Sequence, residues 1–227
     1  LFRSPMMTRR SFVWQGLVTS TSMLLAGMTG ISFSQFARAT EDRRWQMPDE
    51  GAPHAATWMA FGASAEIWEP HLLPVVQENL ALVAKTIAAF EPVNMLVREE
   101  DGELAARLCG PSVNLLVHPI DDLWIRDTGP VFVKSASGAL GGVGFNFNGW
   151  GNKQEHERDA DVAEFVTDYV HTEFIRSALT LEGGGIEVDG EGTAIITESC
   201  VLNSNRNPGV SKAECEEIGR ASCRERV

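Results

Sequence analysis

From Ala55 onward, the apolar positions of the chain follow two alternating patterns. Short apolar runs, typical of strands, alternate with longer segments in which apolar residues recur at helical spacing. We expect the run at 113–117 to be a buried strand that leads into an acidic loop. The alternation predicts an α/β fold rather than a helical bundle or a β-sandwich. The runs predict strands at 56–61, 93–97, 113–117, 131–133 and 143–148.

Three segments carry the helical pattern. The first begins near Pro74, a residue favoured in the first turn of a helix, and ends before Pro92. The second spans 100–108, and the third spans 162–170. A Ser/Gly turn between the last two predicted strands indicates one hairpin, and Asp189-Gly190 predicts another.

The far C-terminal segment has lost the apolar periodicity. Residues 217–227 show neither a helix cap nor an apolar face that could pack. We therefore interpret 217–227 as a non-native tail.

Composition places the chain among ordinary globular proteins and limits its partners. It has 227 residues, of which 44% are hydrophobic and 22% charged, and its formal net charge is -12. Residues 1–39 hold four arginines and no acid, so the remainder has 15 basic against 31 acidic side chains. Such a body repels nucleic acid and anionic lipid and attracts small cations.

The first 39 residues have the order of an export signal. Arg9-Arg10 precedes Ser11-Phe12, an uncharged stretch follows to Ala37, and Ala37-Arg38-Ala39 offers small residues for cleavage. Paired arginines of this kind predict a twin-arginine signal and a periplasmic or secreted protein, with no stable membrane association after cleavage. A membrane anchor is the alternative, because the stretch is long enough to span a bilayer.

Cysteine and histidine spacing does not favour a metal site. The cysteines form no C-x-x-C pair, and no histidine stands in ligand spacing with a cysteine or another histidine. We therefore predict no metal and no cofactor. The cysteines are Cys109, Cys200, Cys215 and Cys223.

The most informative run is DDLWIRDTGP, residues 121–130. Ligands of α/β proteins gather where strands end, and a carboxylate offers two acceptor oxygens to the two donors of a guanidinium. An indole face favours the same flat cation. The residues alone leave another interpretation open: Asp121 and Asp122 form a turn, Asp127 pairs with Arg126, and Trp124 fills the core.

The run resembles the D-D-x-W-x-R-D-T-G-P signature of agmatine deiminases and their bacterial peptidylarginine deiminase relatives, in the guanidine-modifying superfamily. Three other blocks are similar to the family in the same order. The first departs from it at Gly51-Ala52, where Trp-Glu is more usual, and the second at Gly144, where an aromatic residue is common. The blocks lie at 47–59, 144–151 and 181–208.

The resemblance implies an α/β fold, the five-bladed propeller of this superfamily, with only about its first half present. The implied organisation is a twin-arginine signal peptide at 1–39, a partial deiminase catalytic domain at 40–216 and the tail at 217–227. An incomplete propeller has an unpaired sheet edge, which favours association. A homo-oligomer is therefore left open.

The resemblance also implies roles for individual residues. Asp127 and Glu182 would be the catalytic acids that converge on the substrate guanidinium, with Trp124 as the wall beside it and Trp150 as a further substrate-binding residue. The alternative for Glu182 is a solvated residue before a glycine turn. The family's catalytic cysteine and histidine lie in its C-terminal portion, so we expect this fragment to be inactive.

The implied reaction is hydrolysis of agmatine to carbamoylputrescine and ammonia through a covalent amidino-cysteine intermediate, with no cofactor. The block at 145–150 holds no arginine that could bind a substrate carboxylate, which favours agmatine, whereas export favours a protein substrate. Peptidylarginine deimination and a non-catalytic guanidinium-binding module therefore remain as alternatives.

Overall fold

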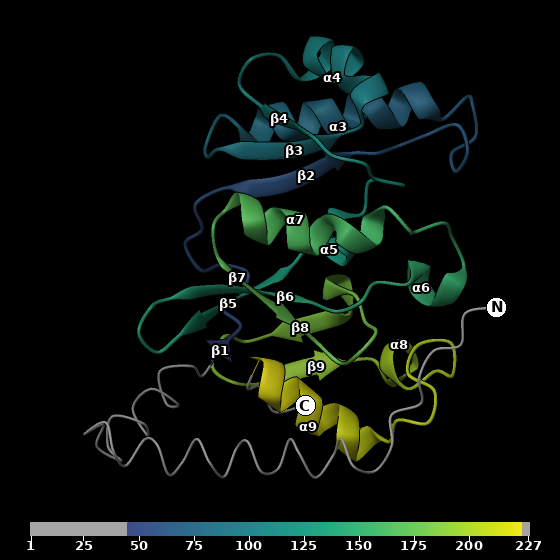
Figure 1. The fold of residues 1–227 in the computed structure, drawn as a ribbon. Coiled ribbons are helices and arrows are strands. Elements are labelled where there is room, and N and C mark those ends of the chain that lie inside the picture. The colour runs from purple at the N-terminus through teal and green to yellow at the C-terminus, as the bar shows by residue number, and fades with distance from the viewer. Residues whose placement is uncertain (1–44, 224–227) are drawn as a thin grey trace, which may run out of the picture. The chain divides into compact units, whose positions relative to one another are not determined.

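The structure, a computed structural model, describes residues 45–223, in which strands and helices alternate (Figure 1). The predicted α/β class is confirmed. The strands are β1 Trp45–Gln46, β2 Thr57–Phe61, β3 Val93–Val97, β4 Asn114–Val117, β5 Val131–Ser135, β6 Leu140–Gly144, β7 Glu173–Arg176, β8 Ile186–Val188 and β9 Ala194–Ile196. The α-helices are α3 Leu73–Ile87, α4 Gly102–Cys109, α5 Ile125–Thr128, α6 Gly149–Asn152, α7 Val162–Tyr169, α8 Glu198–Val201 and α9 Lys212–Cys223. Three short 3-10 helices are η1 Glu99–Asp101, η2 Asp159–Asp161 and η3 Gly183–Gly185.

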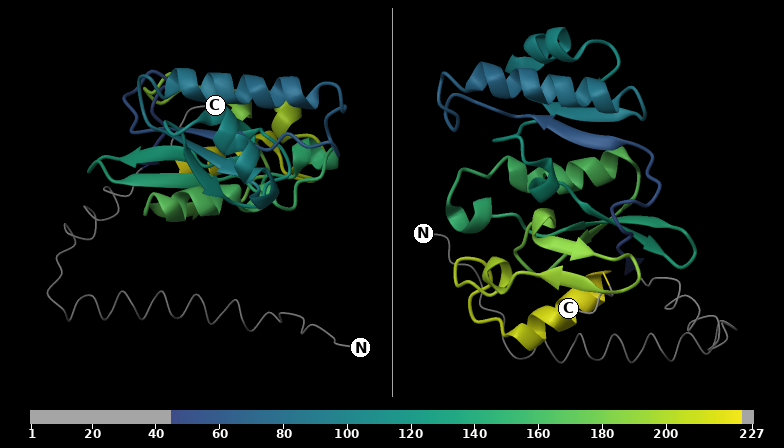
Figure 2. Two further views of the ribbon diagram at one scale, coloured as in Figure 1. Left: turned by 90° about the horizontal axis from the view of Figure 1, so that it is seen from above. Right: turned by 180° about the vertical axis from the view of Figure 1, so that it is seen from behind.

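The first sheet is parallel and has the order β2-β3-β4. Parallel neighbours need a crossover, which α3 and α4 provide. These helices pack on one face of the sheet and α7 on the other, so the central strand is buried on both faces, with Met95 and Leu96 at 0% exposure. The predicted strand at 93–97 is confirmed, and the layers are seen from behind in Figure 2.

The expectation of a buried strand at 113–117 is wrong in part. The strand exists as β4, but it forms the edge of the first sheet, and Val117 is 63% exposed. An apolar run indicates a strand, but it does not show whether a second strand or a helix packs against each side of it.

The first predicted helix is confirmed as α3. Pro74 lies in its first turn, and Ala81 and Ala84 face the sheet. The helix ends at Ile87, and Pro92 stands just before β3, where its missing N–H costs no sheet hydrogen bond.

The second sheet is mixed and has the order β1-β5-β6-β7. Strands β5 and β6 form the predicted hairpin, and the predicted helix at 162–170 is confirmed as α7, which crosses over from β6 to its parallel neighbour β7. Neither β1 nor β7 was predicted, because strands of two and four residues carry too little periodicity.

The strand predicted at 143–148 is wrong beyond Gly144. Asn146 has φ 51°, outside the strand region, and its amide donates to the carbonyl oxygens of Ser177 (2.7 Å) and Leu179 (3.0 Å). The segment therefore leaves the sheet and carries the chain toward α6.

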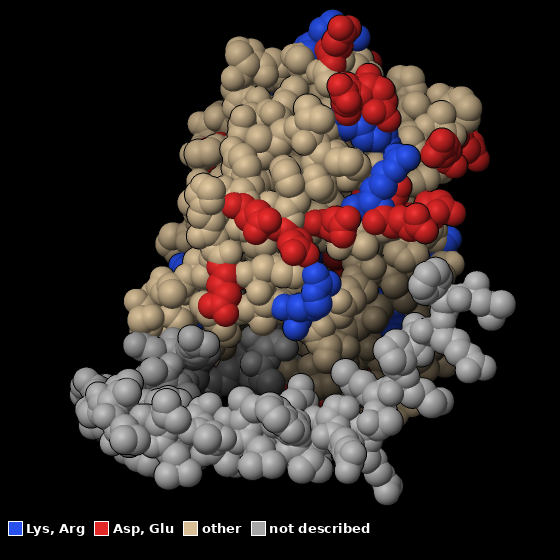
Figure 3. All heavy atoms as spheres, in the orientation of Figure 1, with Lys and Arg blue, Asp and Glu red and all other residues tan. Residues whose placement is uncertain are grey.

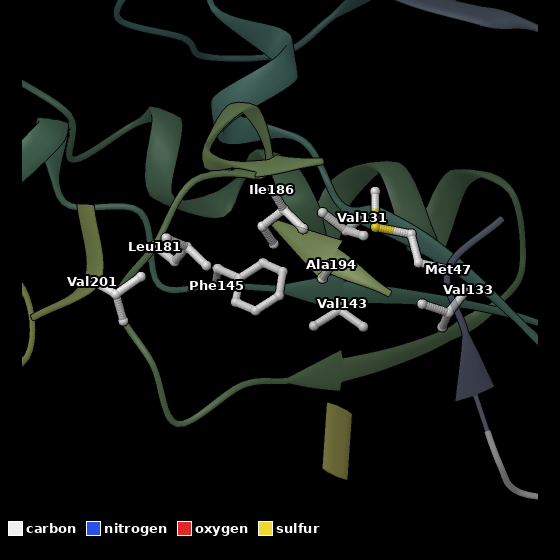
Figure 4. Packing of buried hydrophobic residues seen from close by; sticks show 9 residues of the cluster. All are labelled: Met47, Val131, Val133, Val143, Phe145, Leu181, Ile186, Ala194 and Val201. Atoms are coloured by element: carbon white, nitrogen blue, oxygen red, sulfur yellow. The ribbon is translucent and has the colours of Figure 1, made fainter. Parts of the chain in front are cut away.

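The second predicted hairpin is confirmed as β8 and β9, which pair antiparallel around Asp189. The Asp189 carboxylate accepts from the backbone N–H groups of Glu191 (2.8 Å) and Thr193 (3.0 Å), as in an Asx turn. This hairpin packs on the second sheet, and Figure 4 shows the apolar cluster between them. The cluster is Met47, Val131, Val133, Val143, Phe145, Leu181, Ile186, Ala194 and Val201.

The two ends of the chain leave some predictions untested. The signal predicted at 1–39 lies outside the described residues. Helix α9 runs through Cys223, so part of the proposed tail is helical, yet this does not test whether 217–227 is native. Among residues 45–223, none of the helices has the length and apolar character needed to cross a membrane.

Candidate functional site

The DDLWIRDTGP run connects β4 to β5 and contains the single-turn helix α5. Helix α5 contacts η3, the turn of three glycines that follows Glu182. The fold thereby brings residues 127 and 182, which lie 55 positions apart in the sequence, to one place.

Asp127 is a half-buried carboxylate with two donors. The N–H of Gly184 donates to its Oδ1 (3.1 Å), and the indole Nε1 of Trp150 donates to its Oδ2 (3.3 Å). The alternative pair of Asp127 with Arg126 does not form, because the Arg126 guanidinium donates two hydrogen bonds, of 2.7 and 2.8 Å, to Glu50. Burial raises the pKa of Asp127 above its ordinary value, and the nearby charge of Glu182 adds to the rise.

The approach of Gly184 to Asp127 allows no side chain. A Cβ atom at Gly184 would lie 2.2 Å from Oδ1 of Asp127, far inside van der Waals contact. The glycine turn therefore fixes where the carboxylate stands, a role that its sequence alone did not show.

Trp150 is held in an uncommon backbone conformation. Its φ of 56° and ψ of 36° lie in the left-handed region, which is unfavourable for a bulky residue. The side chain of Asn148 accepts from the N–H of Gly151 (2.9 Å) and stabilises this turn. The strained turn aims the indole N–H at Asp127.

Aromatic rings form a wall beside this carboxylate. Trp124 is 41% exposed, so it does not fill the core, and its ring meets Trp150 edge to face at 6.1 Å. Trp68 stacks near it at 6.4 Å. The buried carboxylate of Asp122 accepts from both Trp68 and Trp124 indoles (2.8 Å each) and from Gln154 (3.1 Å), which fixes the orientation of the wall.

The first aspartates of the run tie this loop to the start of α7. Asp121 accepts from the N–H groups of Arg158 (2.8 Å) and Asp159 (3.3 Å), and Asp159 accepts in return from those of Asp121 (2.8 Å) and Asp122 (3.3 Å). Burial raises the pKa of Asp159 to about 7. Asp121 and Asp122 thus join distant segments, which a local turn does not require.

Glu182 is buried and paired, which the sequence analysis did not anticipate. Both of its oxygens accept hydrogen bonds from Arg206, one of them at 3.1 Å. Less than a tenth of either side chain is exposed. The alternative of a solvated residue is therefore wrong. An ionised carboxylate has about four acceptor sites, so an Arg fork leaves room for further donors. A guanidinium contact from Glu182 stays a prediction.

Cys109 and His118 belong to other parts of the fold. Cys109 is fully buried, with its Sγ 3.7 Å from the sulfur of Met95, and burial raises its thiol pKa. His118 stacks on Phe165 at 4.0 Å, and burial lowers its pKa. Within residues 45–223, no cluster of three or more His, Cys, Asp or Glu side chains could hold a metal ion.

A hollow of about 830 Å³ is lined in part by residues of α5. Its lining includes Glu50, Trp58, Arg126 and Phe132 but neither Asp127 nor Glu182. Because this hollow is not lined by the site residues that the sequence analysis singled out, we place the candidate site at Asp127.

The structure therefore brings together Asp127, Trp124 and Trp150, and sets Glu182 close enough to act on the charge of Asp127. Sequence reasoning missed Trp68, Asp122 as an anchor, Gly184 and Arg206. Asp122, Gly184 and Arg206 each had a signal, since Asp122 stands in the 121–130 run and the other two stand inside the third block of the resemblance. Trp68 stands in none of these segments.

Comparison with known proteins gives consistent matches. A profile of the Porphyromonas-type peptidyl-arginine deiminase family matches residues 46–222. Agmatine deiminase of Stutzerimonas stutzeri is 42% identical over 184 residues, covering 78% of this chain and 50% of that protein. Agmatine deiminase of Ectopseudomonas mendocina is also 42% identical, over 183 residues, with the same coverage.

Among solved structures, agmatine deiminase of Enterococcus faecalis matches with a TM-score of 0.75 and 32% identity, covering 81% of this chain and 52% of that one. The chain thus spans about half the length of the relatives it matches. The predicted fold, about half of an α/β propeller of the guanidine-modifying type, is confirmed.

Proposed function

Because the chain belongs to the Porphyromonas-type peptidyl-arginine deiminase family, we propose that the complete protein hydrolyses agmatine to carbamoylputrescine and ammonia. The observation that carries this proposal is the carboxylate of Asp127, held by Trp150 and Gly184 beside the exposed ring of Trp124. The curated relatives cited above carry the name agmatine deiminase.

The chemistry of the site suits a flat cation. The two oxygens of Asp127 can accept from two N–H groups of a guanidinium in one plane, and the indole face of Trp124 can lie against that plane. Burial of the carboxylate strengthens the attraction relative to water. Glu182 would be the second acidic contact, sharing its remaining acceptor sites with the substrate.

The family resemblance supplies the covalent steps. A cysteine thiolate attacks the guanidinium carbon, and ammonia leaves after a histidine gives it a proton. Water then adds to the amidino-cysteine adduct, and the ureido product leaves as the thiolate is restored. Both groups belong to the family's C-terminal portion, so this chain would bind and orient the guanidinium without completing the reaction.

Peptidylarginine deimination is the second candidate, because the family's own description names it. The contacts of two arginines support agmatine instead. Arg126 is paired with Glu50 and Arg206 with Glu182, so neither is left to bind the carboxylate of a peptide terminus. Agmatine carries no carboxylate.

We also propose that the protein is exported by the predicted twin-arginine signal and that its partner is a small cation rather than nucleic acid. The net charge of -12 supports this choice. Figure 3 shows acidic side chains in a band across one face at the level of α7, with fewer basic ones among them.

The proposal is tested by ammonia release from the complete protein, given either agmatine or a peptide with a C-terminal arginine. We expect kcat/KM to be at least about 100-fold higher for agmatine, because the site selects through a few close polar contacts. The 227-residue chain should bind agmatine at most and release no ammonia. A preference for the peptide would reverse the choice of substrate, and turnover by the chain alone would place the nucleophile within it.

A further inference from the structure

The tripeptide Asn205-Arg206-Asn207 contacts two separate segments of the candidate site. It follows α8 in a turn closed by the N–H of Arg206, which donates to the carbonyl of Asn203 (2.9 Å). Each of its three side chains reaches a different partner.

Arg206 contacts Glu182 through two of its nitrogens. The two side chains are 6% and 7% exposed, so the pair is excluded from water. Arg206 therefore sets the plane of the carboxylate, because a fork of two parallel donors fixes both oxygens at once. A single positive charge would attract Glu182 without setting that plane.

Asn207 fixes the distance between this turn and the segment that carries Glu182. Its side chain accepts from the N–H of Thr180 (2.8 Å) and donates to the carbonyls of Thr180 (2.8 Å) and Val201 (2.9 Å). The Asn207 side chain thus forms two hydrogen bonds with the backbone of Thr180, which lies two residues before Glu182.

Asn205 joins the same turn to the segment that carries Trp150. Its side chain donates to the carbonyl of Gly151 (3.3 Å), and its own carbonyl accepts from Asn148 (2.9 Å). A Cβ atom at Gly151 would lie 2.2 Å from the Asn205 amide, so only glycine permits this approach. The left-handed turn at Trp150 is thereby tied to the turn that holds Glu182.

We infer that Asn205, Arg206 and Asn207 form a clamp that positions the guanidinium site, with Arg206 setting the plane of the Glu182 carboxylate and Asn205 holding the turn of Trp150. This inference rests on the proposed function. Arg206 is a positioning residue, since it acts on the substrate through Glu182.

The test uses the complete protein with Arg206→Lys, which keeps the charge and loses the fork. We expect kcat to fall about 10- to 100-fold while KM changes by less than about threefold, because a misplaced guanidinium is bound but poorly aligned for attack. The melting temperature should stay close to that of the wild type. Arg206→Met, which removes the charge, should lose more activity if it folds.

Arg176→Lys is the matched control. Arg176 also donates to a glutamate, Glu164, at 2.8 Å, but this pair lies on the surface, with 62% of the Arg176 side chain exposed. The kinetics of Arg176→Lys should therefore equal those of the wild type. Wild-type kcat in Arg206→Lys would overturn the clamp and leave the proposed function standing. A wild-type protein that releases no ammonia from agmatine or peptidyl-arginine would overturn both.

Discussion

Replacing Asp127 with Asn in the complete protein is expected to lower kcat/KM for agmatine by about 1,000-fold, or about 4 kcal/mol of transition-state stabilisation. Asparagine keeps the shape of the side chain but offers one acceptor oxygen where the guanidinium needs two. It also turns an N–H₂ group toward either Trp150 or Gly184, each of which already presents a donor. Steady-state kinetics with ammonia detection measure the loss.

Asp168→Asn on α7 is the matched control, since this exposed aspartate lies outside the site and its loss should leave the kinetics unchanged.

The pH profile of activity gives a second check on Asp127. Because the pKa of Asp127 is raised, the carboxylate takes up a proton at a higher pH than an ordinary aspartate. As the pH is lowered, activity should therefore begin to fall at a higher pH than it would with an aspartate of ordinary pKa. Near-normal kinetics in Asp127→Asn would remove this residue from the site.

Replacing Gly184 with Ala is expected to reduce kcat/KM about 10- to 100-fold with little change in the melting temperature. The added methyl group would meet Oδ1 of Asp127 at 2.2 Å, so the carboxylate must move, and a shift of about 1 Å can cost that much in rate. Stability should change little because Gly184 is exposed. Kinetics and thermal unfolding of the same preparation separate the two effects.

Gly102→Ala controls for the loss of glycine itself. Gly102 begins α4 with φ -55°, and a Cβ atom there meets nothing within 4 Å, so the variant should be as active as the wild type. Full activity in Gly184→Ala would mean that the carboxylate of Asp127 does not need the position seen in the structure.

The elements that could be predicted from sequence are those with long periodic patterns. Helix α3 has 15 residues and a proline in its first turn, and β3 is apolar at four of its five positions. Strand β7 has four residues and was missed, because it depends on pairing with β6 rather than on its own pattern. The segment after Gly144 looked like a strand, and the contacts of Asn146 with a distant loop draw it away.

The same division holds at the site. The positions of Asp127, Trp124 and Glu182 could be proposed because they stand in blocks that resemble a known family. The pairing of Glu182 with Arg206 spans 24 positions, and that of Trp68 with Asp122 spans 54, so no local pattern shows them. Such contacts arise from the tertiary arrangement, which brings together segments that lie far apart in the sequence.

The most direct test is a crystal structure of the complete protein with agmatine, in a variant that lacks the proposed cysteine nucleophile. We expect guanidinium nitrogens within about 3 Å of the carboxylates of both Asp127 and Glu182, with the Trp124 ring alongside. Agmatine bound elsewhere, with Asp127 still contacting only Trp150 and Gly184, would contradict it.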